Sequence, residues 1–242
     1  MNTALITGSS GGIGLQIGKD LLDKNYFVNF NCHAIESVKQ LDKELHEHPH
    51  YNNNCNIICQ DLSTIESNIV LGNYFKEKEM NLDIVVLNLG ITDRTPFGEI
   101  KPELWNKVFE TNLSGAFFLI QELKDIINPN GRIIFISSIS GLTTDSISIS
   151  YGVSKAAINM LVPYLAKEFK NKKITVNAVA PGYIDTNWHI GKSNEQIKRI
   201  EKKCLANRLG TTGEISKAVL AIIDNQFING QMIRVDGGFN II

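Results

Sequence analysis

Short apolar segments of strand length alternate along the chain with longer segments in which apolar residues recur at helical spacing. The predicted strands are almost continuously apolar, which is typical of parallel strands that are covered on both faces. They comprise residues 3–7, 26–31, 56–59, 82–88, 131–137, 175–180 and 232–235. The pattern therefore predicts an α/β fold: a doubly wound parallel sheet of about seven strands with helices on both faces.

The composition is that of an ordinary globular chain, and its charges are scattered rather than grouped. Of the 242 residues, 43% are hydrophobic and 20% are charged, and 24 Lys and Arg against 25 Asp and Glu leave a formal net charge of −1. No basic patch appears, so we expect neither a nucleic-acid partner nor a membrane partner. Because no repeat, low-complexity tract or linker interrupts the pattern, residues 1–242 are predicted to form a single domain.

Neither a signal peptide nor a membrane span is predicted. The strand pattern starts at Thr3, and no apolar run approaches the ~20 residues that a membrane-spanning helix needs. Cys55 and Cys59 would lie roughly 13 Å apart in one strand, too far for a disulfide, so the four cysteines are expected to be free thiols. These features predict a cytoplasmic protein.

A glycine-rich segment follows the first predicted strand and precedes an amphipathic helix. It reads Thr7-Gly-Ser-Ser-Gly-Gly-Ile-Gly14. Its glycines allow a tight turn and a close backbone approach, so that N–H groups at the start of the helix can point at a phosphate. Such a segment can be a simple turn, but its position between a first strand and its helix predicts a nucleotide site.

A serine, a tyrosine and a lysine follow the predicted strand 131–137. Ser138 follows this strand, and Tyr151 and Lys155 open the next helix four positions apart, which places the phenol and the ammonium on one face. A nearby cation favours the phenolate and lowers the pKa of a tyrosine from its usual value near ~10. Tyr-x-x-x-Lys alone is more often a surface pair than a catalytic one, so the interpretation depends on the rest of the chain.

Other polar residues follow other predicted strands, at the edge where ligands bind in open α/β sheets. Asp61 follows the third strand, and Asn88 and Gly90 follow the fourth. Asn112 lies in the middle of a helical pattern over 102–120, where the alternative is an exposed or backbone-capping residue. Histidines alternate over 46–50, but the proline inside that run and the asparagines after it favour a solvated loop, so no metal site is predicted.

In this order, the motifs resemble the classical short-chain dehydrogenase/reductase family over nearly the whole chain. The glycine-rich segment matches at 7–14, the adenine-contacting aspartate at Asp61, and the Asn-x-Gly turn at 88–90, where Leu87 and Leu89 depart from the usual Asn-Asn-Ala-Gly. The resemblance implies a Rossmann-like NAD(P)-binding oxidoreductase domain.

Within this family, the chain looks most like the β-ketoacyl acyl-carrier-protein reductases. The segments that carry this closer resemblance are 90–92, 105–113, 208–210 and 235–238. It implies hydride transfer from NAD(P)H to the ketone of a small-molecule or carrier-bound carbonyl substrate. The favoured reaction is 3-oxoacyl-(acyl-carrier-protein) reduction in fatty-acid synthesis. The alternatives are a dehydrogenase of another secondary alcohol, such as a sugar alcohol, a steroid or a small hydroxy compound, and a non-catalytic nucleotide-sensing homologue.

The resemblance also implies a role for each catalytic residue. Tyr151 would donate the proton to the developing alkoxide, and Lys155 would lower the tyrosine pKa and hold the nicotinamide ribose. Ser138 would polarise the carbonyl group, and Asn112 would position a water that relays protons to Lys155. The implied cofactor-binding residues are Gly8, Ser10, Gly12, Ile13, Gly14, Asn31, Asp61, Leu62, Asn88, Gly90, Tyr151, Lys155, Pro181, Gly182, Ile184 and Thr186.

The favoured cofactor is NADP(H), with NAD(H) still accepted. No acidic residue occupies positions 29–33, where one would bind a ribose 2′-hydroxyl and repel a 2′-phosphate. The preference is expected to be modest because neither Gly11 nor Asn31 supplies a cation. An aspartate at position 31 is expected to reverse it.

Two further expectations concern the substrate pocket and the assembly. Residues 91–100 and 187–207 are expected to line the pocket. The candidate side chains are Arg94, Phe97, Trp188 and His189. The resemblance, together with the apolar carboxyl terminus 239–242, implies a homotetramer.

Overall fold

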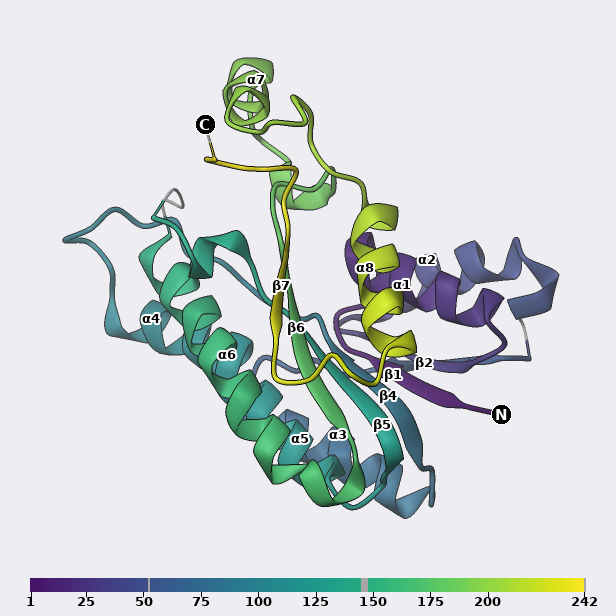
Figure 1. Ribbon diagram of the computed structural model, residues 1–242. Coiled ribbons are helices and arrows are strands. Elements are labelled where there is room, and N and C mark those ends of the chain that lie inside the picture. The colour runs from purple at the N-terminus through teal and green to yellow at the C-terminus, as the bar shows by residue number, and fades with distance from the viewer. Residues whose placement is uncertain (52, 145–147, 242) are drawn as a thin grey trace.

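All seven strands of the sheet run parallel. The computed structural model describes residues 1–51, 53–144 and 148–241. The strands lie in the order β3-β2-β1-β4-β5-β6-β7, so the order reverses between β1 and β4 (Figure 1). Their bounds are β1 (Thr3–Ile6), β2 (Phe27–Cys32), β3 (Cys55–Cys59), β4 (Leu82–Leu87), β5 (Ile127–Ile136), β6 (Thr175–Pro181) and β7 (Met232–Val235). The predicted α/β fold with a doubly wound parallel sheet is confirmed.

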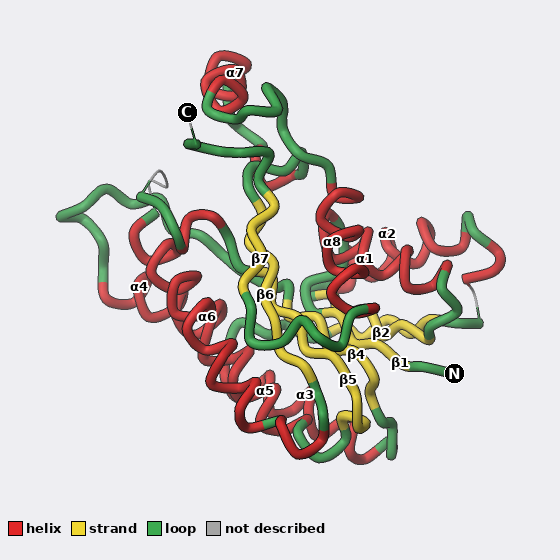
Figure 2. The backbone as a smooth tube through the Cα atoms, in the orientation of Figure 1, coloured by secondary structure: helices red, strands yellow, loops and turns green. Residues whose placement is uncertain are grey.

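Helices cover both faces of this sheet (Figure 2). They are α1 (Gly12–Asp23), α2 (Ile35–His46), α3 (Ile65–Glu77), α4 (Pro102–Phe109), α5 (Gly115–Leu123), α6 (Ile149–Glu168), α7 (Asn194–Lys202) and α8 (Thr212–Asp224). α1, α2 and α8 pack on one face, and α3, α5 and α6 pack on the other, with α4 against α6. α7 instead lies beyond the carboxyl ends of β6 and β7, and none of its residues is buried.

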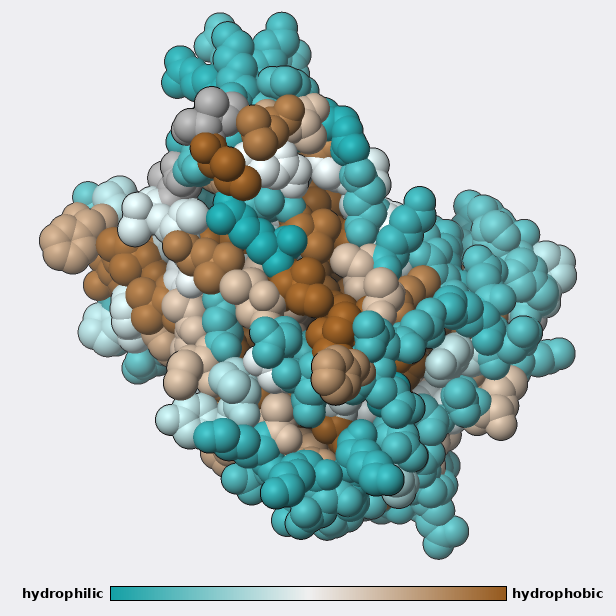
Figure 3. Space-filling view, viewed as in Figure 1, coloured by the Kyte–Doolittle hydropathy of each residue, from teal (hydrophilic) through white to brown (hydrophobic). Residues whose placement is uncertain are grey.

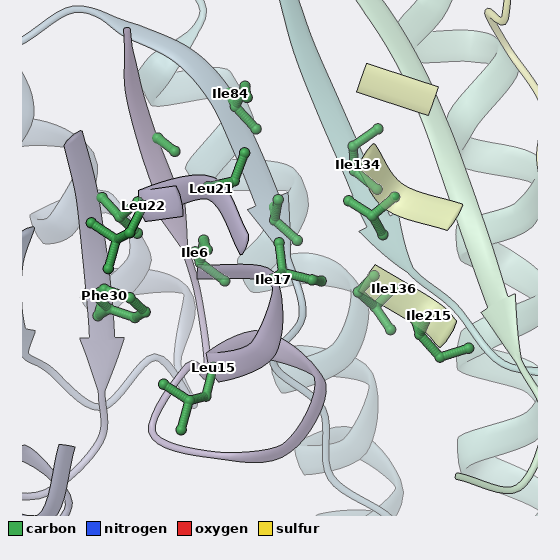
Figure 4. Packing of buried hydrophobic residues seen from close by; sticks show 14 of the residues in the cluster. Ile6, Leu15, Ile17, Leu21, Leu22, Phe30, Ile84, Ile134, Ile136 and Ile215 are labelled. Atoms are coloured by element: carbon green, nitrogen blue, oxygen red, sulfur yellow. The ribbon is translucent and has the colours of Figure 1, made fainter. Parts of the chain in front are cut away.

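Consecutive residues of one strand enter two separate cores. In β1, Ile6 joins the core under α1 and α8, whereas Leu5 joins the core under α3, α5 and α6. Figure 4 shows the first of these cores, where Ile6, Ile17 and Ile136 meet from β1, α1 and β5. Because both faces are buried, nearly every strand position is apolar, which explains the absence of alternation in the sequence.

β5 begins at Ile127, earlier than the predicted start at position 131. Turn-forming residues at 128–131 favoured a loop there, and Asn130 does adopt a left-handed φ of 65°. Ile127 nevertheless pairs with Leu82, and the register shifts between Leu82 and Ile84. A local irregularity of the strand therefore accommodates residues that would otherwise end it.

The helix predicted over 102–120 divides into three parts. α4 ends at Phe109, residues Glu110–Ser114 form a π-helical turn, and α5 begins at Gly115. Asn112 lies in the π-helical turn and is only 1% exposed, so the alternative of an exposed residue is wrong. Single π-helical turns inside α-helices frequently occur at functional sites.

The apolar carboxyl terminus is partly buried within its own chain. Phe239 is 1% exposed, and its ring lies 5.1 Å from the Tyr183 ring. Ile241 is 67% exposed, and Ile242 lies outside the described residues. Phe239 is therefore covered within its own chain, where it lines the cavity, so its burial needs no second subunit.

Candidate active site

A cavity of about 1070 Å³ lies at the carboxyl edge of the sheet. The loops after β1, β4, β5 and β6 contribute to its wall, together with the start of α6 and the segment that contains α7. In Figure 3, hydrophilic side chains cover α7 and hydrophobic side chains gather below it. The predicted residues that line the cavity are Gly8, Ser10, Gly12, Ile13, Asn88, Gly90, Ser138, Tyr151, Lys155, Pro181, Gly182, Ile184 and Thr186.

The glycine-rich loop is held against the end of β4. The Asn88 side-chain amide donates to the Gly8 carbonyl oxygen at 2.7 Å, and the Asn88 backbone N–H donates to Thr7 Oγ1 at 3.1 Å. A Cβ atom at Gly8 would lie 3.0 Å from Leu89 Cα, and Gly8 has a φ of +59°. Glycine is therefore required here by both conformation and space.

The start of α1 fits a dinucleotide phosphate. Within the described residues, its first turn contains no acidic residue and no side-chain cap, so its N–H groups are left for another acceptor. Gly12, with a φ of +57°, and Ile13 line the cavity at this point. Free N–H groups and the helix dipole together favour an anion, so the donor set suits the pyrophosphate of a nicotinamide dinucleotide.

Asn31 does not line this cavity, contrary to expectation. It is 2% exposed within β2, its Oδ1 accepts from the Gly8 N–H at 3.3 Å, and its Nδ2 donates to the Gln60 carbonyl oxygen at 2.9 Å. The side chain is committed to supporting the glycine-rich loop, because β2 continues to Cys32 and turns this position inward.

Three other predicted cofactor residues also lie outside the cavity wall. Gly14 is packed tightly, since a Cβ atom there would lie 2.7 Å from Asn88 Nδ2. Asp61 is exposed and its Oδ1 accepts from the Ser63 backbone N–H at 3.0 Å, whereas Leu62 is 1% exposed in the core. Gly14 therefore contributes by allowing close packing, and Asp61 by shaping its loop.

Tyr151, Lys155 and Ser138 line the same cavity as the glycine-rich loop. Lys155 Nζ lies 5.7 Å from the centroid of the Tyr151 ring and donates to the Ile136 carbonyl oxygen at 2.8 Å. Glycine at position 90 makes room for the lysine, because a Cβ atom there would lie 3.3 Å from Lys155 Nζ. The local fold thus brings a proton donor, a cation and a hydroxyl group to one point of the cavity.

Burial sets the protonation of these groups. Burial lowers the pKa of the Lys155 ammonium to about 8. It also raises the pKa of the Tyr151 phenol, and the hydrogen bond with Ser138 opposes this rise. A low-dielectric environment disfavours the charged form of each group, so burial determines the direction of both pKa shifts in this structure. The role of Lys155 in lowering the tyrosine pKa stays a prediction.

Asn112 connects the loop after β4 to α6. Its Oδ1 accepts from the Ile91 N–H at 2.8 Å, and its Nδ2 donates to the Ile91 carbonyl oxygen and to Ser154 Oγ, each at 3.0 Å. Ser154 Oγ donates in turn to the Tyr151 carbonyl oxygen at 2.8 Å. Asn112 itself does not line the cavity, so its observed contacts are those of a residue that positions Tyr151 and the 91–100 loop.

The expected substrate-pocket segments are only partly in the wall. Arg94 and Trp188 line the cavity, and the Trp188 ring lies 5.7 Å from the Tyr151 ring. Phe97 is 88% exposed and does not line it, because its loop extends into solvent. The side chain of His189 lies outside the described part of the chain.

The sequence did not single out several side chains of the wall, although three of them fall in the predicted segment 187–207. His33 and Ser37 line its far end, after β2 and in the first turn of α2. Lys192, Arg199 and Lys203 line it from the α7 side. The position of His33 just beyond the second strand could have indicated its place in the wall. The residues from the α7 side belong to no motif, and only a helical spacing of four could have grouped Arg199 with Lys203.

Neither a metal cluster nor a membrane-spanning helix is found in the ranges described. No group of three or more His, Cys, Asp or Glu side chains in these ranges could hold a metal ion. His46 and His50 instead lie beside Asp42 and Asp23. Within the same ranges, every helix is too short or too polar to cross a bilayer.

The glycine cradle and the three converging polar groups, on a doubly wound sheet, define a nicotinamide-dependent oxidoreductase. The family described as "Enoyl-(Acyl carrier protein) reductase" matches residues 8–240. The 3-oxoacyl-[acyl-carrier-protein] reductase FabG of Rickettsia bellii is 34% identical over 244 residues, covering 99% of this chain and 97% of the relative. The chain therefore belongs to the short-chain dehydrogenase/reductase family and is an NAD(P)-dependent enzyme.

Other similar proteins carry different names. The acetoacetyl-CoA reductase of an Acinetobacter strain is 30% identical over 242 residues, covering 97% of this chain and 96% of the relative. Among solved structures, the RhlG/NADP active-site complex of Pseudomonas aeruginosa is 28% identical with a TM-score of 0.89, covering 99% of this chain and 96% of that one. The family thus defines the chemistry of this chain without defining its substrate.

Burial of Lys155 makes stability depend on pH in a defined window. Because the pKa is about 8 in the folded protein against 10.5 ordinarily, the cost of burying the ammonium is present below pH 8 and is relieved as pH rises toward 10.5. The variant Lys155→Met removes the ammonium and, with it, the free-energy cost of burying the charge. We expect the variant to gain free energy of unfolding over wild type by on the order of 1 to 3 kcal/mol more near pH 7 than near pH 10.

Urea unfolding of both proteins at the two pH values measures this difference. The exposed Lys198 serves as the control, and Lys198→Met is expected to show no such pH-dependent change. Equal differences between Lys155→Met and wild type at both pH values would contradict the lowered pKa.

Proposed function

We propose that this protein reduces the ketone of a 3-oxoacyl thioester, carried by an acyl carrier protein, with NADPH as hydride donor in fatty-acid synthesis. The observation that carries the proposal is the convergence of Ser138, Tyr151 and Lys155 in a cavity that also contains the glycine-rich start of α1. The acyl-carrier-protein and CoA reductases among its relatives support the thioester class.

Tyr151 is the proton donor in this proposal. As the carbonyl oxygen gains negative charge, the phenol donates its proton to that oxygen, and the Ser138 hydroxyl donates a hydrogen bond to it. The phenol remains protonated at neutral pH because burial raises its pKa, so the proton is available at the moment of reduction. The bound nicotinamide supplies the hydride.

Lys155 and Asn112 support this step. The Lys155 ammonium, held by the Ile136 carbonyl oxygen, would stabilise the phenolate that remains after proton transfer and would donate to the nicotinamide ribose. Asn112 fixes the loop that carries Ile91 against α6 and so holds the substrate side of the cavity in place. Pro181, Ile184 and Thr186 line the cavity and would hold the nicotinamide half of the cofactor.

Removal of the phenolic hydroxyl tests the proton donor. Tyr151→Phe is expected to lower kcat for acetoacetyl thioester reduction by about two orders of magnitude or more, because only the transferable proton is lost. NADPH affinity, measured by fluorescence titration, is expected to stay within about threefold since the ring remains. Tyr164→Phe, at a 60% exposed tyrosine of the same helix, should behave as wild type. A near-normal kcat in Tyr151→Phe would end the assignment.

His33, rather than Asn31, is the position that we propose to meet the cofactor 2′-phosphate. His33 is exposed in the cavity wall directly after β2, and its imidazole can donate a hydrogen bond to a phosphate. Ser37 and Ser10 line the same region with neutral donors. Glu44, the acidic side chain of this end of the wall, is paired with Lys19, so these neutral donors support a preference for NADPH over NADH.

His33→Asp is expected to lower the ratio of NADPH to NADH affinity by tenfold or more, equivalent to about 1.4 kcal/mol, because a carboxylate repels the phosphate and binds a ribose hydroxyl. Calorimetric titration with each cofactor measures this ratio without turnover. Asn31→Asp is the informative comparison: it removes the donor to Gln60 and should lower stability without selectively weakening NADPH. An unchanged ratio in His33→Asp would refute the placement.

We also propose that the protein is a homotetramer that uses an exposed apolar stripe on α6. Ile149, Val153, Met160 and Tyr164 are each 41% to 60% exposed and recur at helical spacing. Such a stripe is unfavourable in water unless another chain covers it.

Val153→Glu is expected to dissociate the assembly, as measured by light scattering at micromolar concentration, because it places a charge in the covered stripe. Val70→Glu changes a comparably exposed valine on α3, which is 57% exposed, and should leave the assembly intact. A wild-type monomer, or dissociation in both variants alike, would contradict this surface.

A further inference from the structure

One face of α7 and the residues beside it form part of the cavity wall. Gln196, Arg199, Ile200 and Lys203 line the cavity, and their spacing of three and four places them on one side of the helix. Lys192, which precedes α7, also lines it. Figure 1 shows α7 beyond the ends of β6 and β7.

This part of the wall is strongly cationic. Arg94, Lys192, Arg199 and Lys203 contribute four cationic side chains, in addition to Lys155. Among the described residues of the wall, the single acidic side chain is Glu44, which pairs with Lys19 at the α1–α2 end. Within the described part of the wall, this side of the cavity therefore carries positive charge without an acidic side chain.

Three of these cations have no carboxylate partner. Across the described ranges, no ion pair includes Arg94, Lys192 or Arg199, whereas other cations such as Lys76 and Arg208 pair with Glu122 and Glu214. The pKa of Lys192 is lowered, first by burial and then by the positive charge of Arg94. The protein thus holds like charges near one another, an arrangement that an anionic ligand would stabilise.

The position of Arg94 relates this cluster to the reacting carbon. Arg94 donates to the Trp188 carbonyl oxygen at 3.3 Å, and the Trp188 ring lies 5.7 Å from the Tyr151 ring. Trp188 therefore links the cluster to the surroundings of the proton donor. The proposed contacts for cofactor phosphates are elsewhere, at the start of α1 and at His33.

We propose that Arg94, Lys192 and Arg199 form a binding site for the phosphate of the pantetheine arm that carries the acyl thioester. This inference rests on the proposed function and extends it to how the substrate's carrier is recognised. A phosphate accepts several charge-assisted hydrogen bonds, and a guanidinium can supply two in a bidentate arrangement. Acyl carrier protein and coenzyme A share this phosphorylated arm, so the site recognises the arm and not the rest of either carrier.

The test compares two substrates that differ by one phosphate: acetoacetyl-pantetheine and its 4′-phosphate ester. In wild type, the phosphorylated ester should have the lower KM. In the double variant Lys192→Gln and Arg199→Gln, the KM of the phosphorylated ester should rise about tenfold or more, and that of the unphosphorylated ester less than about twofold. Lys198→Gln, on the neighbouring position of α7 outside the wall, should change neither value. An equal change for both esters would overturn the site.

Two binding measurements separate this inference from the cofactor and from the proposed activity. NADPH affinity should be unchanged in the double variant; a comparable loss of NADPH affinity would show that these cations serve the cofactor. Calorimetric titration with pantetheine and 4′-phosphopantetheine needs no turnover. If wild type binds 4′-phosphopantetheine more tightly than pantetheine and the double variant does not, the phosphate site is supported. This holds even if neither ester is reduced, and in that case only the proposed activity fails. If wild type binds pantetheine and 4′-phosphopantetheine with equal affinity, the proposed phosphate site is overturned.

Discussion

Parallel pairing of all seven strands is the constraint on which the site depends. Because each strand points the same way, the segments that leave β1, β4, β5 and β6 meet at one edge of the sheet. The glycine-rich loop, Asn88, Ser138 and Pro181 are thereby brought into one cavity although they are remote from one another along the chain. Covering both faces with helices keeps the strands rigid and leaves this edge as the place where polar groups can remain accessible.

Within that edge, backbone packing makes room for a buried ammonium. Lys155 is 3% exposed and donates to a single backbone carbonyl, that of Ile136, among the contacts found in the described chain. A Cβ atom at Gly141 would lie 2.7 Å from the Ala156 backbone nitrogen, so the loop after β5 can approach α6 only with glycine there. The same burial that disfavours the charge also makes its interactions strong, which suits a cation placed to act on a neighbouring phenol.

The π-helical turn has a comparable purpose on the substrate side. Asn112 satisfies both backbone groups of Ile91 and reaches Ser154 on α6, so one side chain couples the loop after β4 to the helix that carries Tyr151. A continuous α-helix would present this position differently, because the extra residue of a π-turn rotates the side chains that follow. The cationic face of α7 lies over the same side of the cavity, on a helix without buried residues.

The apolar pattern and the order of motifs determined the fold class, the strand positions to within a few residues, and the association of Ser138, Tyr151 and Lys155, since these depend on local periodicity and on chain order. Tertiary structure decided where each side chain points. It turned Asn31 inward and left His33 in the cavity wall, because β2 continues by one residue. It also buried the Tyr151 phenol, which raises its pKa, and assembled Arg94, Lys192 and Arg199, because desolvation and long-range proximity depend on packing that no local pattern encodes.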